Sequence, residues 1–452
     1  MDGISFENYF TSEMGEQLGA SYAIPEKYFS DKVKRGLRNS DGTGVMVGVT
    51  KVGRVIGYNI EDGEIIPVPG KLYYRGVSVV DIANAHIQSG TFGYEEVAYL
   101  LLMGKLPTRS ELQEFDALLS SARTLPAGFN DDIILKSPSR DIMNKLSRCV
   151  LALYSYDPDP DNTSLGNMLR QSIELVARLP VIVANAYAAK RHHFDNKSLY
   201  IHYPKESLSV SENFLRMIRK DKSYTPEEAH LLDLMMILHA EHGGGNNSAF
   251  VCRALSSSGT DTYSAIAGAV NSLKGPLHGG ANAKVRQMVS YVTENVPDPG
   301  DDAQMTDYLS KLLKGEAGDR SGKIYGLGHA VYTMSDPRAE LLRAQAAVMA
   351  EQKGMMRDFD YLRSIEKNGS RLIVETKGLD TPICANVDLY SGFVARMLGI
   401  PDEMLTPLFA ISRISGWCAH RIEEVLTGRR IMRPAYRSAI KTAAYVPIDE
   451  RG

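Results

Sequence analysis

The sequence predicts a mostly α-helical protein with a small β-hairpin region near the N-terminus. Runs rich in strand-favouring residues occur only before about residue 78. From Ser78 onward the apolar residues recur at helical spacing, in segments separated by glycine, proline and aspartate. The length of 452 residues exceeds what one hydrophobic core usually supports, so we expect two domains or one domain with an insertion.

Two features predict the hairpin near residues 45–75. Residues Val45–Val52 alternate loosely between apolar and other side chains, and the dipeptide Asp62-Gly63 separates two further strand-favouring runs. An Asp-Gly turn between such runs is a strong hairpin signal. We therefore expect a small sheet here and no strand further along the chain.

Helical periodicity is clear in residues 93–104 and 165–178. Another helix should run from about Asp261 to Lys274 and stop at Gly275-Pro276. The polar stretch Val296–Asp302 interrupts the pattern, and we expect it to join two helices rather than two autonomous domains.

A capping box marks the start of one buried helix. Thr225, the following proline and Glu228 are an N-cap, a first helical residue and a capping-box glutamate. The helix should end around His242, because the three glycines that follow can adopt the left-handed conformation that closes a helix. His239 and His242 would then share one face of its last turn, where the simplest role for either is to cap exposed carbonyls.

Composition gives no reason to expect a macromolecular partner. The formal net charge of -3 favours neither nucleic acid nor an anionic membrane. The first residues lack the features of a signal peptide, and no apolar stretch reads as long enough to cross a bilayer, so we expect a cytoplasmic protein. The four cysteines, Cys149, Cys252, Cys384 and Cys418, form no C-x-x-C pair, and we expect them to be reduced and mostly structural.

His278 lies between the stop at Gly275-Pro276 and a new helix that begins near Gly280. The positive end of that helix disfavours a charged imidazolium. A neutral imidazole in this position can donate one N–H bond to a developing enolate. A purely structural histidine at a helix start is an equally good interpretation of this residue alone.

Asp388 and Arg413 are charged residues in otherwise apolar helical runs. Partial burial would raise the pKa of Asp388 toward a value useful in a general base. A buried arginine such as Arg413 requires an anionic partner. An ion pair between these two residues is the structural alternative to a role in a functional site.

Arg338 should lie in the first turn of a helix that begins with Asp336 as N-cap and Pro337 as first helical residue. A cation there opposes the helix dipole. A bound carboxylate ligand would resolve this conflict, whereas a solvated arginine is the commoner outcome.

Two further interpretations start from the same motifs. His239, His242, His278 and His329 could form the metal site of a hydrolase, although the sequence has no HExxH pattern. The glycines after His242 could form a phosphate cradle, although they follow a helix and lack the lysine of a P-loop.

Taken together, the ordered polar residues of the second half resemble the citrate synthase family in type, order and spacing. The matching pieces are His239-Ala240-Glu241-His242 with its glycines, Gly275–Asn282, Gly326–Tyr332, Asp336-Pro337-Arg338, Asn386-Val387-Asp388, and Ser412–Trp417 through Arg433-Pro434. The resemblance runs from about Gly63 to Tyr436, and the N-terminal segment has no clear counterpart in the shorter bacterial members. It implies a two-domain helical fold, with a large domain of residues 1–278 and 396–452 and a small domain of residues 279–395.

The resemblance also implies a reaction and the residues that carry it. Asp388 would remove a methyl proton from acetyl-CoA, His278 would donate a hydrogen bond to the thioester oxygen, and His329 would polarise the carbonyl of oxaloacetate. Citryl-CoA would form and be hydrolysed to citrate and CoA, as in the tricarboxylic acid cycle. The remaining implied contacts are His242, Arg338 and Arg413 to oxaloacetate, Arg433 to oxaloacetate from the second subunit of a homodimer, and Gly326, Leu327, Gly328, Ala330 and Asn386 to CoA.

The resemblance implies that the chain is an acyltransferase. It implies no metal and no cofactor, because the CoA thioester is a substrate. Many bacterial members have arginine after the histidine of the Gly326–Tyr332 motif, whereas this chain has Ala330, so its CoA contacts differ in detail. Two alternatives remain: 2-methylcitrate synthase, which uses propionyl-CoA with the same catalytic residues, and a noncatalytic sensor on the same scaffold.

Overall fold

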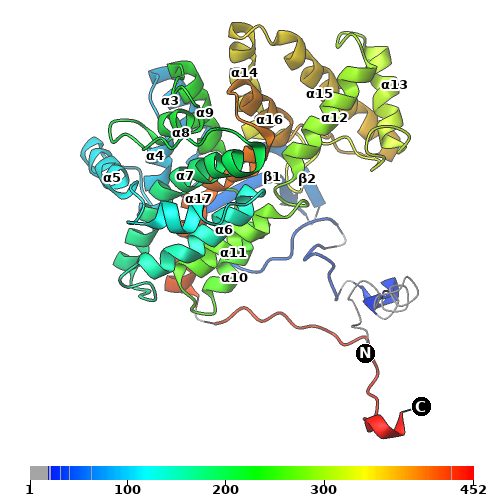
Figure 1. Cartoon of the computed structure of the whole chain (residues 1–452). Coiled ribbons are helices and arrows are strands. Elements are labelled where there is room, and N and C mark those ends of the chain that lie inside the picture. The colour runs from blue at the N-terminus through cyan, green and yellow to red at the C-terminus, as the bar shows by residue number, and fades with distance from the viewer. Residues whose placement is uncertain are drawn as a thin grey trace, which may run out of the picture. The chain divides into compact units, whose positions relative to one another are not determined.

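The computed structural model describes residues 19, 22–30, 32–39, 41–62, 64–428 and 430–451 (Figure 1). The chain divides into two units, residues 49–432 and a second unit of residues 1–48 with 433–452. The functional motifs, apart from Arg433, belong to the first unit. The division of that unit into a large and a small domain near residues 278 and 395 stays a prediction.

Helices dominate the described residues, as the sequence predicts. The α-helices are α3 Val79–Ser89, α4 Tyr94–Met103, α5 Arg109–Ala122, α6 Ile142–Leu153, α7 Leu165–Asp195, α8 Val210–Ile218, α9 Pro226–His239, α10 Asn247–Ser256, α11 Thr262–Lys274, α12 Ala281–Asn295, α13 Asp302–Leu313, α14 Pro337–Gln352, α15 Met356–Lys377, α16 Val387–Met397 and α17 Leu405–Thr427. Shorter turns are Glu26–Tyr28, Asn130–Leu135, Tyr154–Tyr156, Asp402–Met404 and Ile448–Glu450. The expected breaks at Gly275-Pro276 and at residues 296–301 both separate helices.

The predicted hairpin is present but begins later than expected. Strands β1 Gly53–Glu61, β2 Glu64–Tyr74 and β3 Val77–Ser78 form an antiparallel sheet in that order. Residues 45–50 have no regular structure. The first residue of β1, Gly53, pairs with the last residue of β2, Tyr74, so β2 offers no further partner for the residues before Gly53. After Tyr74 the chain turns and forms β3. Gly63 of the expected Asp-Gly turn lies outside the described residues.

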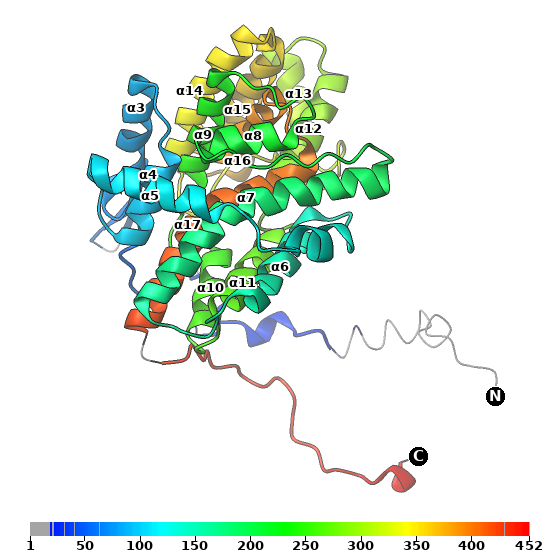
Figure 2. The same cartoon turned by 60° about the vertical axis from the view of Figure 1, so that its left-hand side comes forward.

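Helix α17 forms the centre of the core. Every residue from Ala410 to Ile422 is buried. The helix contacts α4, α7, α9, α10 and α11, and Figures 1 and 2 show it enclosed by these elements. Any polar side chain on its middle turns is therefore removed from water.

Helix α7 corrects the expectation that no segment is long enough to cross a membrane. The helix is 31 residues long, and its most apolar stretch has a mean hydropathy of 1.3, so it satisfies that criterion by length and composition. Within the structure, however, 83% of its most apolar stretch is buried. This burial is typical of the core helix of a folded domain, where the apolar residues pack against protein.

The β1–β2 hairpin packs against a loop of the second half of the chain. A Cβ atom on Gly57 would lie 2.2 Å from the Val331 carbonyl oxygen, and one on Gly70 would lie 2.1 Å from the Ser335 carbonyl oxygen. The Gly70 N–H also donates to Ser335 Oγ at 3.1 Å. Only glycine permits such close approach of two backbones, so the hairpin fixes the position of residues 331–335.

This packing makes Gly57 sensitive to one added methyl group. We expect Gly57→Ala to lower the free energy of unfolding by about 1–3 kcal/mol, because the Cβ atom must displace the Val331 backbone. Gly166→Ala in α7 is the matched control, because nothing lies within 4 Å of its added Cβ atom. Denaturant unfolding of the wild type and of both variants measures the free energies of unfolding. A Gly57→Ala variant as stable as the wild type would show that the hairpin is not pressed against the loop.

Candidate active site

The end of α9 sets the position of His242. The helix ends at His239 rather than near His242, because distant side chains take over its last hydrogen bonds. The Tyr74 hydroxyl donates to the Ile237 carbonyl at 2.9 Å and accepts from the Glu241 N–H at 3.4 Å, so it stands between two groups that would pair directly in a continuing helix. His239 and His242 therefore do not share a helical face as predicted, and His242 lies in the loop beyond.

Three aromatic rings converge at this loop. The His242 ring lies 5.1 Å from the His329 ring, centroid to centroid, at an interplanar angle of 80°. The Tyr332 ring stacks on His329 at 4.7 Å and 27° and meets His242 at 5.6 Å. Residues separated by nearly ninety positions in sequence thus form one compact group, as their shared chemistry predicts.

His329 has a defined tautomer when neutral. The backbone N–H groups of Val331 and Tyr332 both donate to its Nδ1 atom, at 3.0 and 3.1 Å. Nδ1 is therefore the acceptor nitrogen, and the network assigns the ring proton to Nε2. The loop itself prepares Nε2–H as a hydrogen-bond donor.

His278 has the opposite tautomer. The Ser248 N–H, in the first turn of α10, donates to His278 Nε2 at 3.3 Å, which assigns the proton of the neutral ring to Nδ1. Burial, with a smaller contribution from the Arg413 charge, lowers the pKa of His278 to about 4. This direction agrees with the predicted neutral state, and burial and the Arg413 charge are causes that the sequence interpretation did not name.

Asp388 lies half-buried in the first turn of α16, after its N-cap Asn386. Its Oδ1 atom accepts a hydrogen bond from Asn282 Nδ2 at 2.7 Å, and the Asn282 Oδ1 atom in turn accepts from Ser391. Burial raises the pKa of Asp388 to about 6, although the nearby Arg338 charge favours the carboxylate. The sequence predicted this direction and its cause.

Arg338 is buried, and its partner corrects the sequence interpretation. Asp336, the N-cap of α14, accepts from Arg338 Nε at 3.0 Å and from Nη2 at 2.7 Å. Burial opposes the charged guanidinium, yet the Asp336 carboxylate holds the pKa of Arg338 above its usual value. The cation at this helix start is thus already balanced within the protein, so its position alone does not require a ligand.

Arg413 lies in the centre of α17 with no exposed surface. Its Nε atom donates to the His239 carbonyl at 2.6 Å, while Nη1 and Nη2 have no hydrogen-bond partner among the described residues. Burial lowers the pKa of Arg413 to about 10, so the side chain remains charged at neutral pH. The ion pair between Asp388 and Arg413, which was the structural alternative, does not form among the described residues. The two Nη groups are therefore available to an anion.

Several buried polar atoms without a partner gather in this region. Among the described residues, His239 Nε2, Glu241 Oε2, His242 Nε2, Tyr332 Oη and both Arg413 Nη atoms have none. A buried polar group without a hydrogen bond costs about 1–3 kcal/mol, so such a cluster requires an explanation. A polar ligand enclosed by these residues would satisfy several of them at once.

A buried chain of charges behind the site was not predicted. His420 Nε2 contacts Glu241 Oε1 at 2.9 Å, and Arg253 Nη1 donates to His420 Nδ1 at 2.9 Å. Arg253 also pairs with Glu423 at 2.7 Å and Glu424 at 2.9 Å. Since arginine only donates, His420 Nδ1 is the acceptor and Nε2–H binds Glu241. His420, Glu423 and Glu424 lie about one turn apart on α17, and this spacing was the sequence feature from which a polar network could have been predicted.

The residues expected to contact CoA also come together. Leu327 and Ala385 form an isolated antiparallel bridge, and Asn386 Nδ2 donates to the Gly328 carbonyl at 2.8 Å. Gly326 and Gly328 both adopt positive φ angles, of 83° and 84°, which glycine alone adopts without strain. Ala330 is exposed beside this segment. The amide of Asn386 thus positions the loop, and its contact with CoA stays a prediction.

Three further interpretations of the sequence concern Arg433, a metal site and the cysteines. Arg433 is exposed and belongs to the unit of residues 1–48 and 433–452, whereas the other predicted site residues belong to the unit of residues 49–432. No group of three or more His, Cys, Asp or Glu side chains in the described ranges could hold a metal ion, so the hydrolase interpretation gains no support. All four cysteines are free, as expected.

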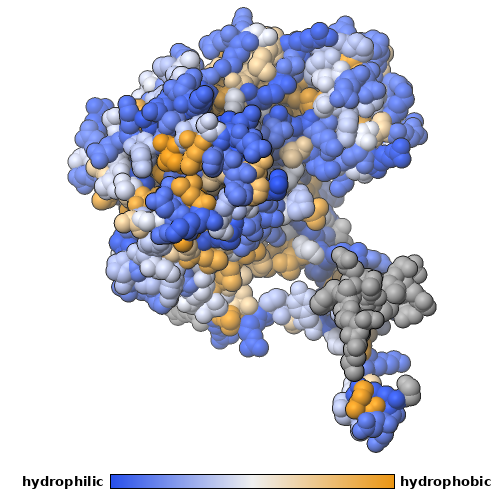
Figure 3. All heavy atoms as spheres, viewed as in Figure 1, coloured by the Kyte–Doolittle hydropathy of each residue, from blue (hydrophilic) through white to orange (hydrophobic). Residues whose placement is uncertain are grey.

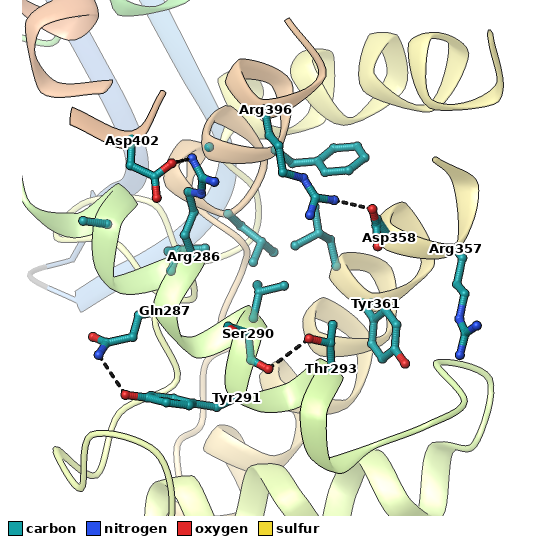
Figure 4. Close-up of a pocket in the computed structure, with 17 residues that line it drawn as sticks. Arg286, Gln287, Ser290, Tyr291, Thr293, Arg357, Asp358, Tyr361, Arg396 and Asp402 are labelled. Carbon is teal, nitrogen blue, oxygen red and sulfur yellow. Dashed lines mark hydrogen bonds and ion pairs between the residues drawn. The ribbon is translucent and has the colours of Figure 1, made fainter. Parts of the chain in front are cut away.

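A cavity of about 800 Å³ lies among α12, α15, α16 and Asp402 (Figure 4). Its charged side chains already have partners, since Arg286 pairs with Asp402, Arg396 with Asp358, and Arg357 donates to the Pro297 carbonyl at 2.6 Å. None of the predicted site residues lines it. The cluster around His242, His329 and Arg413 is therefore the better candidate.

Comparison with known proteins identifies the family. The family model described as citrate synthase, C-terminal domain, matches residues 41–435, which begins ahead of the expected Gly63. The citrate synthase of Haloferax volcanii is 34% identical over 428 residues, covering 93% of this chain and 100% of the relative. The 2-methylcitrate synthase 1 of Corynebacterium glutamicum is 31% identical, covering 86% of this chain and 94% of the relative.

The fold is also shared with solved structures. Citrate synthase of Thermoplasma acidophilum, in a ternary complex with carboxymethyl coenzyme A and oxaloacetate, superposes with a TM-score of 0.74 at 27% identity, covering 90% of this chain and 97% of that one. The match to the family model, over residues 41–435, includes His242, His278, His329 and Asp388. This chain belongs to the citrate synthase family, a family of acyltransferases.

Proposed function

We propose that the chain condenses acetyl-CoA with oxaloacetate and water to give citrate and CoA. The observation that carries this proposal is the buried Arg413 guanidinium, whose two Nη groups have no partner in the described residues and which lies with Arg338 and His242. A dianionic ligand such as oxaloacetate offers the missing acceptors. Burial, with the positive charge of Arg338, lowers the pKa of His242 well below its usual value, so this ring is a neutral partner for the same ligand.

Enolisation of acetyl-CoA requires a base at the methyl group and a hydrogen-bond donor at the thioester oxygen. The Asp388 carboxylate removes a proton from the methyl group of acetyl-CoA, and the C–H electron pair becomes the enol double bond. Nδ1–H of His278 donates to the thioester oxygen as negative charge develops there. A carboxylate whose pKa is near 6 is a stronger base than an ordinary aspartate and is still ionised at neutral pH.

Condensation then uses His329. Its Nε2–H donates to the ketone oxygen of oxaloacetate and polarises the carbonyl. The enol carbon attacks the carbonyl carbon, and the electron pair of the C=O double bond moves to the ketone oxygen. That oxygen takes the Nε2 proton of His329 and becomes the hydroxyl of citryl-CoA, and the proton that Asp388 removed from the methyl group later restores the neutral imidazole. Water then attacks the thioester, the C–S bond breaks, and citrate and CoA leave. The histidine N–H groups polarise both carbonyls, so the proposed steps do not need a metal.

A homodimer would complete the site with Arg433 from the second subunit. In support, Leu277, directly before His278, is fully exposed, at 100% of its surface. Leu151 of α6 and Leu255 of α10 are also exposed, at 46% and 36%. Figure 3 shows further apolar side chains on the surface, near the left side of the body and along its lower edge. An apolar surface beside a catalytic histidine is suited to subunit contact.

The acyl group and the location complete the proposal. Acetyl-CoA is the proposed preferred substrate, as for the relatives named citrate synthase. Propionyl-CoA is the alternative, because one relative is a 2-methylcitrate synthase and a single methyl group changes binding by only about 1–3 kcal/mol. The glycine segment Gly326–Gly328 with Ala330 would receive CoA. The free cysteines are consistent with a cytoplasmic location. The proposed reaction, which forms citrate, would place the chain in the tricarboxylic acid cycle.

The function is tested by release of free CoA thiol in the presence of oxaloacetate. We expect a higher kcat/KM for acetyl-CoA than for propionyl-CoA, and a loss of about 10²–10⁴-fold in kcat for Asp388→Ala, because a general base contributes that much. Preference for propionyl-CoA would make the chain a 2-methylcitrate synthase. No thiol release from either substrate by the wild type would disprove the enzymatic proposal.

The acid limb of the pH profile should report Asp388. Only the carboxylate is a base, and burial raises its pKa to about 6, so kcat/KM should fall as pH falls below about 6 rather than below about 4. Asn282→Ala removes a hydrogen bond to the charged form and should move the limb to higher pH, by about one unit. Ser391→Ala is the milder control, since Ser391 contacts Asn282 and not Asp388. A wild-type limb near pH 4 would contradict this assignment.

The shared site should be visible by complementation. In a dimer of Asp388→Ala and Arg433→Ala subunits, one site carries both changes and the other carries neither. Unfolding and refolding the two inactive variants together in equal amounts should restore about a quarter of the wild-type sites by random pairing. Each variant refolded alone is the control. Recovery no greater than these controls would show that Arg433 does not act across subunits.

A further inference from the structure

Tyr332 is a buried residue of the site with no role in the proposed chemistry. Only 1% of its surface is exposed. One face of its ring stacks on His329, and the guanidinium carbon of Arg338 lies 5.7 Å from the ring centroid. Tyr332 thus contacts both the imidazole that would polarise oxaloacetate and an arginine that would bind it.

Two independent contacts join Tyr332 to the same imidazole. Its backbone N–H donates to His329 Nδ1 at 3.1 Å, and its ring lies 4.7 Å from the His329 ring at an angle of only 27°. The hydrogen bond fixes which nitrogen carries the proton. The stacked ring fixes the plane in which Nε2–H points, because rotation of the imidazole would break the parallel contact.

The position of Tyr332 is itself enforced from the hairpin. A Cβ atom on Gly57 would lie 3.0 Å from Tyr332 Cα, and one on Gly70 would lie 2.7 Å from Tyr332 Cδ1. The tyrosine is therefore held between β1–β2 on one side and His329 on the other. A side chain packed in this way cannot swing aside to let the imidazole turn.

We propose that Tyr332 is a positioning residue that fixes the orientation of the His329 imidazole through its ring and not through its hydroxyl. This inference rests on the proposed function of His329. The hydroxyl has no hydrogen-bond partner among the described residues, so its removal leaves no protein group newly unpaired there. The ring is needed because it supplies the flat surface parallel to the imidazole.

Two substitutions separate the ring from the hydroxyl. Tyr332→Phe keeps the stacked ring, whereas Tyr332→Leu keeps an apolar side chain without a flat face. We expect kcat for Tyr332→Leu to fall by about 10–100-fold, since a misplaced polarising group acts mainly in the transition state. The KM for oxaloacetate should change by less than about threefold, and Tyr332→Phe should keep kcat within about threefold of the wild type.

A spectroscopic measurement tests the orientation without relying on turnover. The chain has 10 histidines, so proteins labelled with ¹³C at histidine Cε1 should give a countable set of signals. His329→Gln assigns the His329 signal by its absence. The ring current of Tyr332 should displace this signal in the wild type and in Tyr332→Phe, and the displacement should disappear in Tyr332→Leu.

The outcomes are distinct. Unchanged kcat in Tyr332→Leu, or an equal loss in Tyr332→Phe, would overturn the proposal, and so would a His329 signal that is the same in all three proteins. Loss of activity with a large rise in KM alone would indicate a ligand contact instead and would also overturn it. A wild type without thiol release would disprove the proposed function, and the ¹³C signal would still decide the orientation.

Discussion

The structure is organised around a positive charge that is held out of water. Arg413 lies at the middle of α17 with 0% exposed surface, and removing a guanidinium from water costs several kcal/mol unless it is paired. Within the described ranges only its Nε group is satisfied, by the carbonyl that ends α9. Glu241, held by His420 and Arg253 behind it, supplies the nearest negative charge that moderates this cost. The protein therefore holds a buried and incompletely paired cation at the expense of stability, as the proposed oxaloacetate site requires.

Features set by neighbouring residues could be predicted from the sequence. Thr225 and Asp336 cap the helices expected of them, because a cap depends on a side chain and an amide only two or three residues apart. The direction of the Asp388 pKa shift follows from the apolar residues around it. The site residues needed their joint pattern, since each histidine alone is explained as well by helix capping.

Contacts between distant segments could not be predicted. The Tyr74 hydroxyl ends α9 three residues early from 163 positions away, and His420 reaches Glu241 across 179. No local propensity encodes a hydrogen bond that replaces one inside a helix. Asp336 is different, because its sequence position next to Pro337 and Arg338 allowed both a cap and an ion pair, and only the cap was recognised. Local rules thus describe the elements, while the fold decides which polar groups are satisfied.

The hairpin also constrains the order in which the protein can assemble during synthesis. Its glycines pack against residues 331–335, and Gly70 and Ser335 are 265 positions apart. At about 5–20 residues per second, the ribosome reaches the second segment roughly 13–50 s after the first. An isolated two-stranded hairpin is at best marginally stable, and Ile60, Ile65 and Ile66 are exposed even in the finished fold. The nascent chain therefore carries an unsupported apolar hairpin through most of its synthesis, and the loop of residues 331–335 gains its support only when nearly three quarters of the protein exists.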